Sequence, residues 1–223
     1  MIFIVLIALI ILAIAIYYFS NKQVIIRTLA KTPNKPVGGL KTNSFTKVTG
    51  KALHVKQPLI APFSKRECVY YKIIIEEKRS NGKNSHWKTL IKESKIQEFF
   101  IKSKGEHVIV RPSLKPKNFK SYLVVDKKTS SGTFNNPTKE FLELLKNYNI
   151  KSEGFLGFNK SLRYTEAILE LEETVTVAGI AKWKNLKEPV NGYPYSKIAE
   201  LVSTENQKLI ITDLPSINFS KRR

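Results

Sequence analysis

The sequence predicts a mainly β protein with an N-terminal transmembrane helix and one short amphipathic helix. Three observations predict this fold class. The chain begins with a long apolar run, and after it short runs rich in Val, Ile, Tyr, Phe and Thr alternate with turn residues. A single later segment spaces its apolar residues as a helix does. With 223 residues and a hydrophobic fraction of 42%, the chain is long enough for one ordinary domain plus an appendage.

The first element, residues 1–20, is predicted to be a transmembrane anchor. The run from Ile2 to Phe19 has no charged side chain, Gly, Pro or amide. As a helix it would be roughly 27 Å long, close to the roughly 30 Å of a bilayer's hydrocarbon core. Tyr17 and Tyr18 stand where an aromatic belt would lie. The alternative, a cleaved signal peptide, needs a basic region before the run and small residues after it, and the sequence has neither.

The charges after the apolar run predict its orientation. Basic side chains follow the run with no acid among them, whereas no basic side chain precedes it. Because Lys and Arg beside a span are retained in the cytoplasm, we expect the N-terminus outside and the β-rich part in the cytoplasm. The chain is rich in lysine throughout, so composition is an alternative source of this asymmetry. The flanking basic residues are Lys22, Arg27, Lys31 and Lys35.

Residues 21–45 are predicted to be a juxtamembrane linker, because Pro33, Pro36 and the Gly38-Gly39 pair interrupt both helical and strand periodicity. One β domain is expected over residues 46–215, with mainly antiparallel pairing. Its expected strands are Thr46–Val55, Val69–Lys78, Trp87–Glu93, Phe99–Ser103, His107–Arg111, Ser121–Asp126, Arg163–Leu171, Thr174–Trp183, Ile198–Val202 and Lys208–Thr212.

Turn residues predict two hairpins within this domain, one through Asn81-Gly82 and one through Lys104-Gly105. Between the strands, residues 137–148 carry four apolar side chains at positions i, i+3, i+4 and i+7. This spacing predicts a short amphipathic helix that covers the sheet. The last residues, 216–223, are predicted to be a basic tail. The apolar positions of the helix are Phe141, Leu144, Leu145 and Tyr148.

A Val-x-Gly-x-Ala pattern occurs twice, at 48–52 and at 177–181. The repeat suggests two equivalent strands in a pseudo-symmetric barrel or sandwich. No longer internal repeat is evident.

We find no sequence motif for catalysis, for a cofactor or for a metal ion. A single Cys, Cys68, and three scattered His residues exclude zinc sites of the finger or RING kind. No His lies near Cys68 in sequence to act as its base, so a buried structural thiol is the favoured interpretation. Acidic pairs occur at Glu76-Glu77 and Glu172-Glu173, but neighbouring side chains on a strand face opposite sides. We interpret both pairs as solvated strand edges.

The formal net charge of +20 predicts attraction to anionic surfaces. Nucleic acid is one such partner, but the charge comes from 31 Lys against 7 Arg, and Arg is the residue favoured for planar phosphate recognition. For a chain anchored in a lipid bilayer, anionic lipid headgroups are the more economical partner, at about 1 kcal/mol per basic residue near the surface. Nucleic acid is therefore the less favoured partner.

Four motifs, in this order along the chain, resemble the GIDE or BAM (beside a membrane) domain. Phe45–Ala52 resembles the glycine strand of this domain. Pro58–Ser64 resembles its Leu-x-Ala-Pro turn, and Glu67–Tyr71 resembles the Cys-Val-Tyr-Tyr strand that follows the turn. Phe99–Ile101 with Val108–Val110 resembles the next hairpin of the domain. Arg163–Glu166 with Val175–Ala181 resembles its Arg-Tyr-x-Glu strand pair. The motif residues for which this resemblance implies a structural role are Gly50, Ala61, Pro62, Cys68, Tyr70, Arg163, Glu166 and Gly179.

This family includes mitochondrial ubiquitin ligases of the MULAN/MAPL type, which carry a second span and a C-terminal RING. The present sequence has neither, so the resemblance does not extend to ligase activity. In those ligases the BAM domain lies on the non-cytosolic side, opposite to the side that the flanking charges predict here. We favour the charges, because that topology is linked to the second span.

The sequence therefore predicts a single-pass, membrane-anchored binding or scaffold module with a membrane protein as its partner. An enzymatic role is not favoured. The alternatives are a RING-less relative or subunit of a ubiquitin-ligase-like system and, less favoured, a membrane-tethered nucleic-acid binder.

Overall fold

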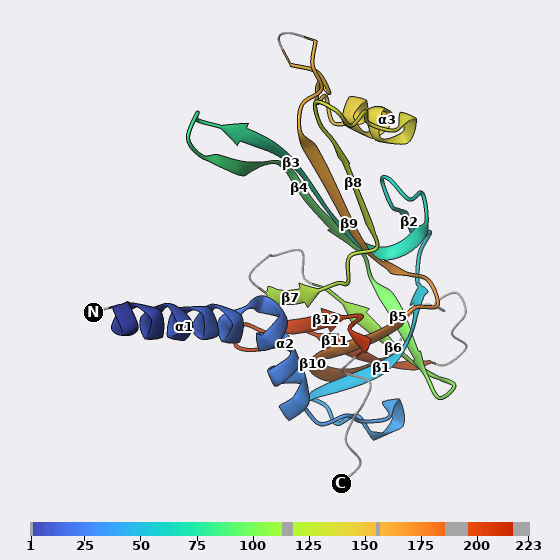
Figure 1. Cartoon of the computed structure of the whole chain (residues 1–223). Coiled ribbons are helices and arrows are strands. Elements are labelled where there is room, and N and C mark those ends of the chain that lie inside the picture. The colour runs from blue at the N-terminus through green and yellow to red at the C-terminus, as the bar shows by residue number, and fades with distance from the viewer. Residues whose placement is uncertain (1, 113–117, 155–156, 186–195, 216–223) are drawn as a thin grey trace. The chain divides into compact units, whose positions relative to one another are not determined.

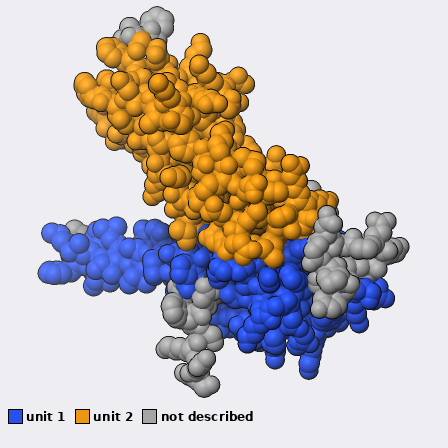
Figure 2. All heavy atoms as spheres, turned by 90° about the vertical axis from the view of Figure 1, so that its right-hand side faces the viewer, with its two compact units in different colours: residues 1–51, 100–122, 174–223 blue, residues 52–99, 123–173 orange. Residues whose placement is uncertain are grey.

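The computed structural model describes residues 2–112, 118–154, 157–185 and 196–215, and it is mainly β. The chain forms two compact units (Figures 1 and 2). Unit 1 comprises residues 1–51, 100–122 and 174–223, and unit 2 comprises residues 52–99 and 123–173. The segment expected as one β domain is thus distributed over both units. The expected basic tail, residues 216–223, lies outside the described residues.

Unit 1 begins with two helices, α1 (Ile2–Phe19) and α2 (Asn21–Lys31). The predicted apolar helix is confirmed as α1. α2 occupies the first part of residues 21–45, the segment predicted as a juxtamembrane linker, and its helical structure was not expected. Ser20 separates the two helices with an extended backbone, and its hydroxyl caps α2 by accepting a hydrogen bond from the Gln23 amide. Pro33 ends α2, since the residue before a proline avoids the helical conformation.

The strands of unit 1 form a seven-stranded sheet in the order β1-β5-β6-β11-β10-β12-β7. A further pairing between β1 and β10 closes β1, β5, β6, β11 and β10 into a ring, and β12 and β7 extend the sheet from β10. The strands are β1 (Phe45–His54), β5 (Phe99–Ser103), β6 (Glu106–Arg111), β7 (Phe119–Tyr122), β10 (Thr174–Asn185), β11 (Lys197–Val202) and β12 (Leu209–Thr212).

Pairing among the described strands is mainly antiparallel, as expected, but this sheet also contains two parallel pairs that the sequence did not indicate. β10 pairs antiparallel with β1, β11 and β12, but β11 with β6 and β12 with β7 are parallel. Parallel neighbours need a long crossover between them, and here each crossover includes the second segment of unit 2. Apolar alternation along a strand carries no information about such distant partners.

The two copies of the Val-x-Gly-x-Ala pattern lie side by side on β1 and β10, with Val48 opposite Val177. Both glycines allow a close approach between strands. A Cβ on Gly50 would overlap the Lys102 carbonyl oxygen of β5, and one on Gly179 would lie 2.7 Å from Leu209 Cδ1. The repeated glycines therefore occur where neighbouring strands of this sheet approach closely.

Unit 2 contains a five-stranded antiparallel sheet in which β3 is central. β3 pairs with β2 and β4 and with β9, which in turn pairs with β8. The predicted hairpin through Asn81-Gly82 is confirmed between β3 and β4. The strands are β2 (Leu59–Ile60), β3 (Glu67–Ser80), β4 (Ser85–Ile96), β8 (Lys127–Ser131) and β9 (Leu162–Glu170).

The predicted amphipathic helix is confirmed as α3 (Lys139–Asn147). The Thr138 hydroxyl caps it, and Phe141, Leu144 and Leu145 are buried in one apolar cluster with side chains of β3 and β9. The other expected strands coincide with observed strands apart from small differences at their ends, except at Ser121–Asp126. There the strand ends at Tyr122, because its partner β12 ends opposite it at Thr212.

Candidate functional site

α1 is long and apolar enough to cross a membrane, by length and composition. Its mean hydropathy is 3.1, and none of its residues is buried. Figure 1 shows the helix extending away from the strands of unit 1. Monomeric soluble proteins rarely expose an apolar surface of this extent, so α1 is a candidate for contact with lipid.

The C-terminal end of α1 is joined to α2 through two tyrosines. Gln23 donates a hydrogen bond of 2.7 Å to the Tyr17 hydroxyl, and the Arg27 guanidinium lies 3.6 Å from the centre of the Tyr18 ring. The first residue of α2, Asn21, donates to the Ser121 carbonyl of β7 at 3.0 Å. α2 therefore connects the candidate span to the sheet of unit 1 by specific contacts.

The apolar side of α2 packs on the sheet of unit 1. Ile25 and Leu29 are fully buried in a cluster with Ala178 and Ile210. At the C-terminal end of α2, buried Lys47 donates from Nζ to the Leu29 carbonyl oxygen at 2.6 Å. A cation is favourable at this end of a helix, while burial lowers the pKa of Lys47.

The four basic residues predicted to flank the span occupy different positions. Lys22 lies 5.5 Å from the centre of the Tyr122 ring. Arg27 and Lys31, one turn apart on α2, both line a hollow of about 420 Å³ beside the helix. Lys35 follows α2 and is exposed, and its backbone amide donates to the Lys47 carbonyl. Only Arg27 and Lys31 of these four are brought together at one hollow.

A second hollow of about 190 Å³ adjoins the first and shares four of its lining residues. It adds Lys120 of β7 and Lys208, which precedes β12. Sequence reasoning missed both lysines, since nothing in the sequence relates them to α2. We call the two hollows together the α2 groove. Its described lining consists of Val24, Ile25, Arg27, Thr28, Lys31, Thr32, Pro33, Phe45, Lys120, Asn206, Gln207, Lys208 and Ile210.

In unit 2, Glu166 binds the turn between β2 and β3, in which two of the expected motif residues lie. Its fully buried carboxylate accepts hydrogen bonds from the Phe63 amide at 3.0 Å and the Ser64 amide at 3.1 Å. The Tyr164 hydroxyl donates a third, at 2.8 Å. Ala61 and Pro62 lie in the same turn, which backbone hydrogen bonds of Ala61 close. Glu166 therefore stabilises a turn and offers no free oxygen for chemistry.

Cys68 and Tyr70 lie on β3, and both are fully buried. Burial, with Glu166 nearby, raises the pKa of the Cys68 thiol to about 12. Because the thiolate is the nucleophilic form, this environment is unsuited to nucleophilic catalysis at neutral pH. The Tyr70 hydroxyl accepts a hydrogen bond of 3.4 Å from Ser94.

Arg163 on β9 donates to Glu76 at 2.5 Å and stacks 4.1 Å from the centre of the Trp87 ring. Glu77 pairs with Arg79 at 2.9 Å and with Lys160 at 3.7 Å. The interpretation of Glu76 and Glu77 as solvated strand edges is therefore wrong, because cross-strand and nearby cations bind both carboxylates.

A second acidic group of unit 2 was not anticipated from the sequence. The carboxylate of Glu93 accepts hydrogen bonds from the Tyr71 hydroxyl at 2.5 Å and the Tyr148 hydroxyl at 2.9 Å. Burial is the main cause of the raised pKa of both tyrosines, and their hydrogen bonds to Glu93 raise the pKa further. These tyrosines stay protonated at neutral pH and act as structural donors beside α3.

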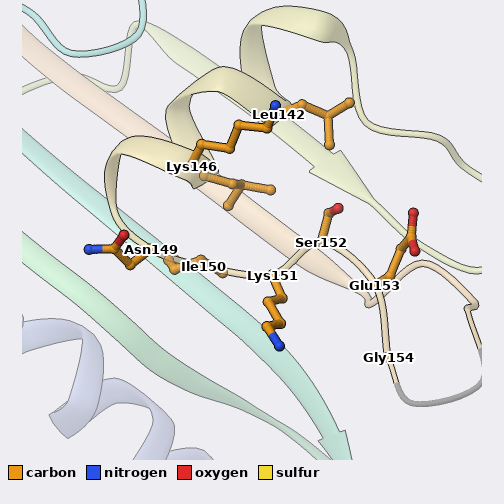
Figure 3. Close-up of a pocket in the computed structure, with 9 residues that line it drawn as sticks. Leu142, Lys146, Asn149, Ile150, Lys151, Ser152, Glu153 and Gly154 are labelled. Atoms are coloured by element: carbon orange, nitrogen blue, oxygen red, sulfur yellow. The ribbon is translucent and has the colours of Figure 1, made fainter.

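A hollow of about 620 Å³ lies between α3 and the segment that follows it (Figure 3). Leu142, Leu145 and Ile150 supply its apolar lining, and Lys146, Lys151 and Glu153 supply charges. Among the described residues, no three His, Cys, Asp or Glu side chains are placed to hold a metal ion.

No protein-family model, curated protein or solved structure matches this chain.

Proposed function

We propose that α1 spans a lipid bilayer and that the chain is a single-pass, membrane-anchored binding or scaffold module. The observation that carries this proposal is α1 itself, an 18-residue apolar helix with no buried residue. The contacts of Tyr17 and Tyr18 with α2 support it, because tyrosine is enriched at the level where a span leaves the hydrocarbon.

The proposed orientation places the N-terminus outside and both β units in the cytoplasm. Its support is the basic flank of α1 at Lys22, Arg27, Lys31 and Lys35, which follows the rule that cations beside a span are retained in the cytoplasm. The resemblance to the BAM domain of mitochondrial ligases implies the opposite side, and the charges are the more direct argument for this chain.

The proposed mechanism is tethering. Anchoring by α1 raises the effective concentration of the β units near partners in the same membrane, so a weak contact becomes sufficient. The partner proposed is a membrane protein, and the net charge of +20 adds attraction to anionic lipid headgroups.

The assignment of residues 46–215 as BAM-like belongs to the same proposal. Its support is the order of the four motifs, together with the contacts of Glu166, which join the Arg-Tyr-x-Glu motif to the turn of Ala61 and Pro62. In this assignment the motif residues are structural, which agrees with a binding module.

The orientation is tested by fusing a cytoplasm-dependent reporter after Arg223 in intact cells. We expect an active reporter. An inactive reporter from a chain that stays in the membrane would place the β units on the far side and overturn the argument from charge.

The tethering mechanism is tested by crosslinking in the same cells with three versions of the chain. The intact chain and a version with an unrelated apolar span in place of α1 should capture the same membrane protein, because the β units hold the contact. A version without any span should lose that capture. Equal capture without a span would contradict tethering.

A further inference from the structure

The α2 groove combines cations and apolar surface from α2 and from strands of unit 1. α2 contributes Arg27 and Lys31, β7 contributes Lys120, and the segment leading into β12 contributes Lys208. Val24, Phe45 and Ile210 supply apolar lining between these charges. A site with both properties suits an amphiphile that carries a negative charge.

None of the four cations has an acidic partner within the described part of the chain, and no carboxylate lines the groove there. The nearest acid in sequence, Glu205, is not among the lining residues. The Arg27 guanidinium stacks on the ring of Tyr18, which is a cation–π contact and not an ion pair. Among the described residues, the positive charge of the groove is therefore uncompensated, and an external anion can neutralise it.

The groove also lies close to the end of the candidate span. α2 begins two residues after Phe19, the last residue of α1, and Arg27 stacks on Tyr18 within α1. If α1 spans the bilayer, Tyr18 stands at the interface and Arg27 stands at the depth of the lipid phosphates. The larger hollow, at about 420 Å³, falls within the roughly 300–1,000 Å³ that small-molecule sites occupy.

We propose that the α2 groove binds the phosphate headgroup of an anionic lipid, with Arg27, Lys31, Lys120 and Lys208 as its ligands. Basic pockets beside transmembrane helices bind such headgroups, because they place positive charge at the level of the lipid phosphates. A zwitterionic lipid is disfavoured, because its ammonium group would enter a groove whose described lining has four cations and no carboxylate. This inference rests on the proposed membrane anchorage and gives the anchored protein a lipid preference.

The test uses the full chain in nanodiscs of phosphatidylcholine with a small fraction of phosphatidylglycerol, and native mass spectrometry counts the anionic lipids that stay bound. Two groove variants are compared, Arg27→Gln with Lys31→Gln, and Lys120→Gln with Lys208→Gln. The second pair leaves α2 intact, so a folding defect of α2 does not obscure the result. The matched control is Lys146→Gln with Lys151→Gln, which removes the same charge beside the hollow of unit 2.

We expect each groove pair to weaken phosphatidylglycerol retention by roughly tenfold or more, and the control pair to leave it unchanged. An equal loss of phosphatidylglycerol retention in the groove and control variants would show that retention depends on overall charge, and it would overturn the proposed site. Displacement of bound phosphatidylglycerol by soluble glycerol phosphate at matched concentration would assign the groove to a free phosphate compound. Oligonucleotide binding that the groove variants abolish, with lipid retention unchanged, would assign it to nucleic acid.

Failure of this inference is distinct from failure of the proposed anchorage. All variants keep α1 unchanged, so a chain that does not enter nanodiscs at all contradicts the anchorage. A chain that enters them and retains phosphatidylglycerol equally in every variant contradicts only the groove.

Discussion

The two units use their charged side chains differently. In unit 2, the three described arginines each bind a carboxylate: Arg66 binds Asp126 and Glu170, Arg79 binds Glu77, and Arg163 binds Glu76. In unit 1, Arg111 and Lys184 pair with buried Glu200, but the cations of the α2 groove have no such partner within the described residues. The comparison separates charges that stabilise the fold from charges that are free to bind an external anion.

The largest predicted effect is the loss of the structural carboxylate of unit 2. Glu166→Ala removes the acceptor of three hydrogen bonds and leaves two partly buried amides and the buried Tyr164 hydroxyl without it. We expect the free energy of unfolding of unit 2 to fall by about 3 kcal/mol. Denaturation of the full chain in detergent micelles measures it, with Trp87 as the reporter in a Trp183→Phe background.

The matched control is Glu143→Ala, which removes an exposed carboxylate of α3 and should change the free energy of unfolding by less than about 0.5 kcal/mol. A loss below about 1 kcal/mol for Glu166→Ala would show that the turn does not depend on this carboxylate.

The second prediction concerns the glycines of unit 1. Gly50→Ala places its Cβ against backbone atoms of Lys102, which cannot move away alone, and should destabilise unit 1 by about 2 kcal/mol. Gly179→Ala meets the end of the Leu209 side chain first and should cost less, about 1 kcal/mol. Trp183 fluorescence in a Trp87→Phe background follows the unfolding of unit 1.

Gly132→Ala is the control for a glycine with room for a Cβ, because its nearest neighbour would be Ser161 Oγ at 3.6 Å; Gly132 lies in unit 2, so its unfolding is followed through Trp87 in a Trp183→Phe background. If Gly50→Ala is as harmless as Gly132→Ala, the strands of the closed ring are not as close as described.

A smaller effect is expected from the Cys68 thiol at alkaline pH. Its pKa is raised from 9.0 to about 12 in the folded chain, so the folded state retains a proton that the unfolded state loses above pH 9. The stability of unit 2 should therefore fall as the pH rises, by about 1 kcal/mol between pH 9 and pH 10. Cys68→Ala removes this contribution, and the difference between the two pH profiles measures it. Parallel profiles would contradict burial of the thiol.

The smallest effect on stability is expected in the α2 groove. Arg27→Gln with Lys31→Gln breaks no ion pair among the described residues and should lower the stability of unit 1 by less than about 1 kcal/mol, measured through Trp183. A larger loss would mean that these cations stabilise the fold, as the arginines of unit 2 do, and the contrast between the units would disappear.

Local patterns predicted much of the fold. The apolar run gave α1, the spacing of Phe141, Leu144 and Leu145 gave α3, and Phe99–Ser103 coincides with β5. α2 was missed because only two of its residues, Ile25 and Leu29, are buried, and their partners Ala178 and Ile210 are far away in sequence. β8 was missed because Lys127–Ser131 is polar and depends on pairing with β9.

The candidate site was predictable only in part. The sequence shows that four basic residues follow the span: Lys22, Arg27, Lys31 and Lys35. It does not show that Arg27 and Lys31 line the α2 groove whereas Lys22 and Lys35 lie outside it. Lys120 and Lys208 reach the groove through the parallel pairing of β7 with β12. Such pairing depends on the whole fold, so spacing along the chain does not contain it.

The most direct test of the central claim, that α1 anchors the chain in a bilayer, is alkaline carbonate extraction of membranes from cells that express it. We predict that the intact 25.5 kDa chain stays in the membrane pellet. A variant with Leu9→Arg and Leu12→Arg should move to the supernatant, because each charge at the centre of a span is costly. Release of the unmodified chain into the supernatant, or its recovery without α1, would contradict the account.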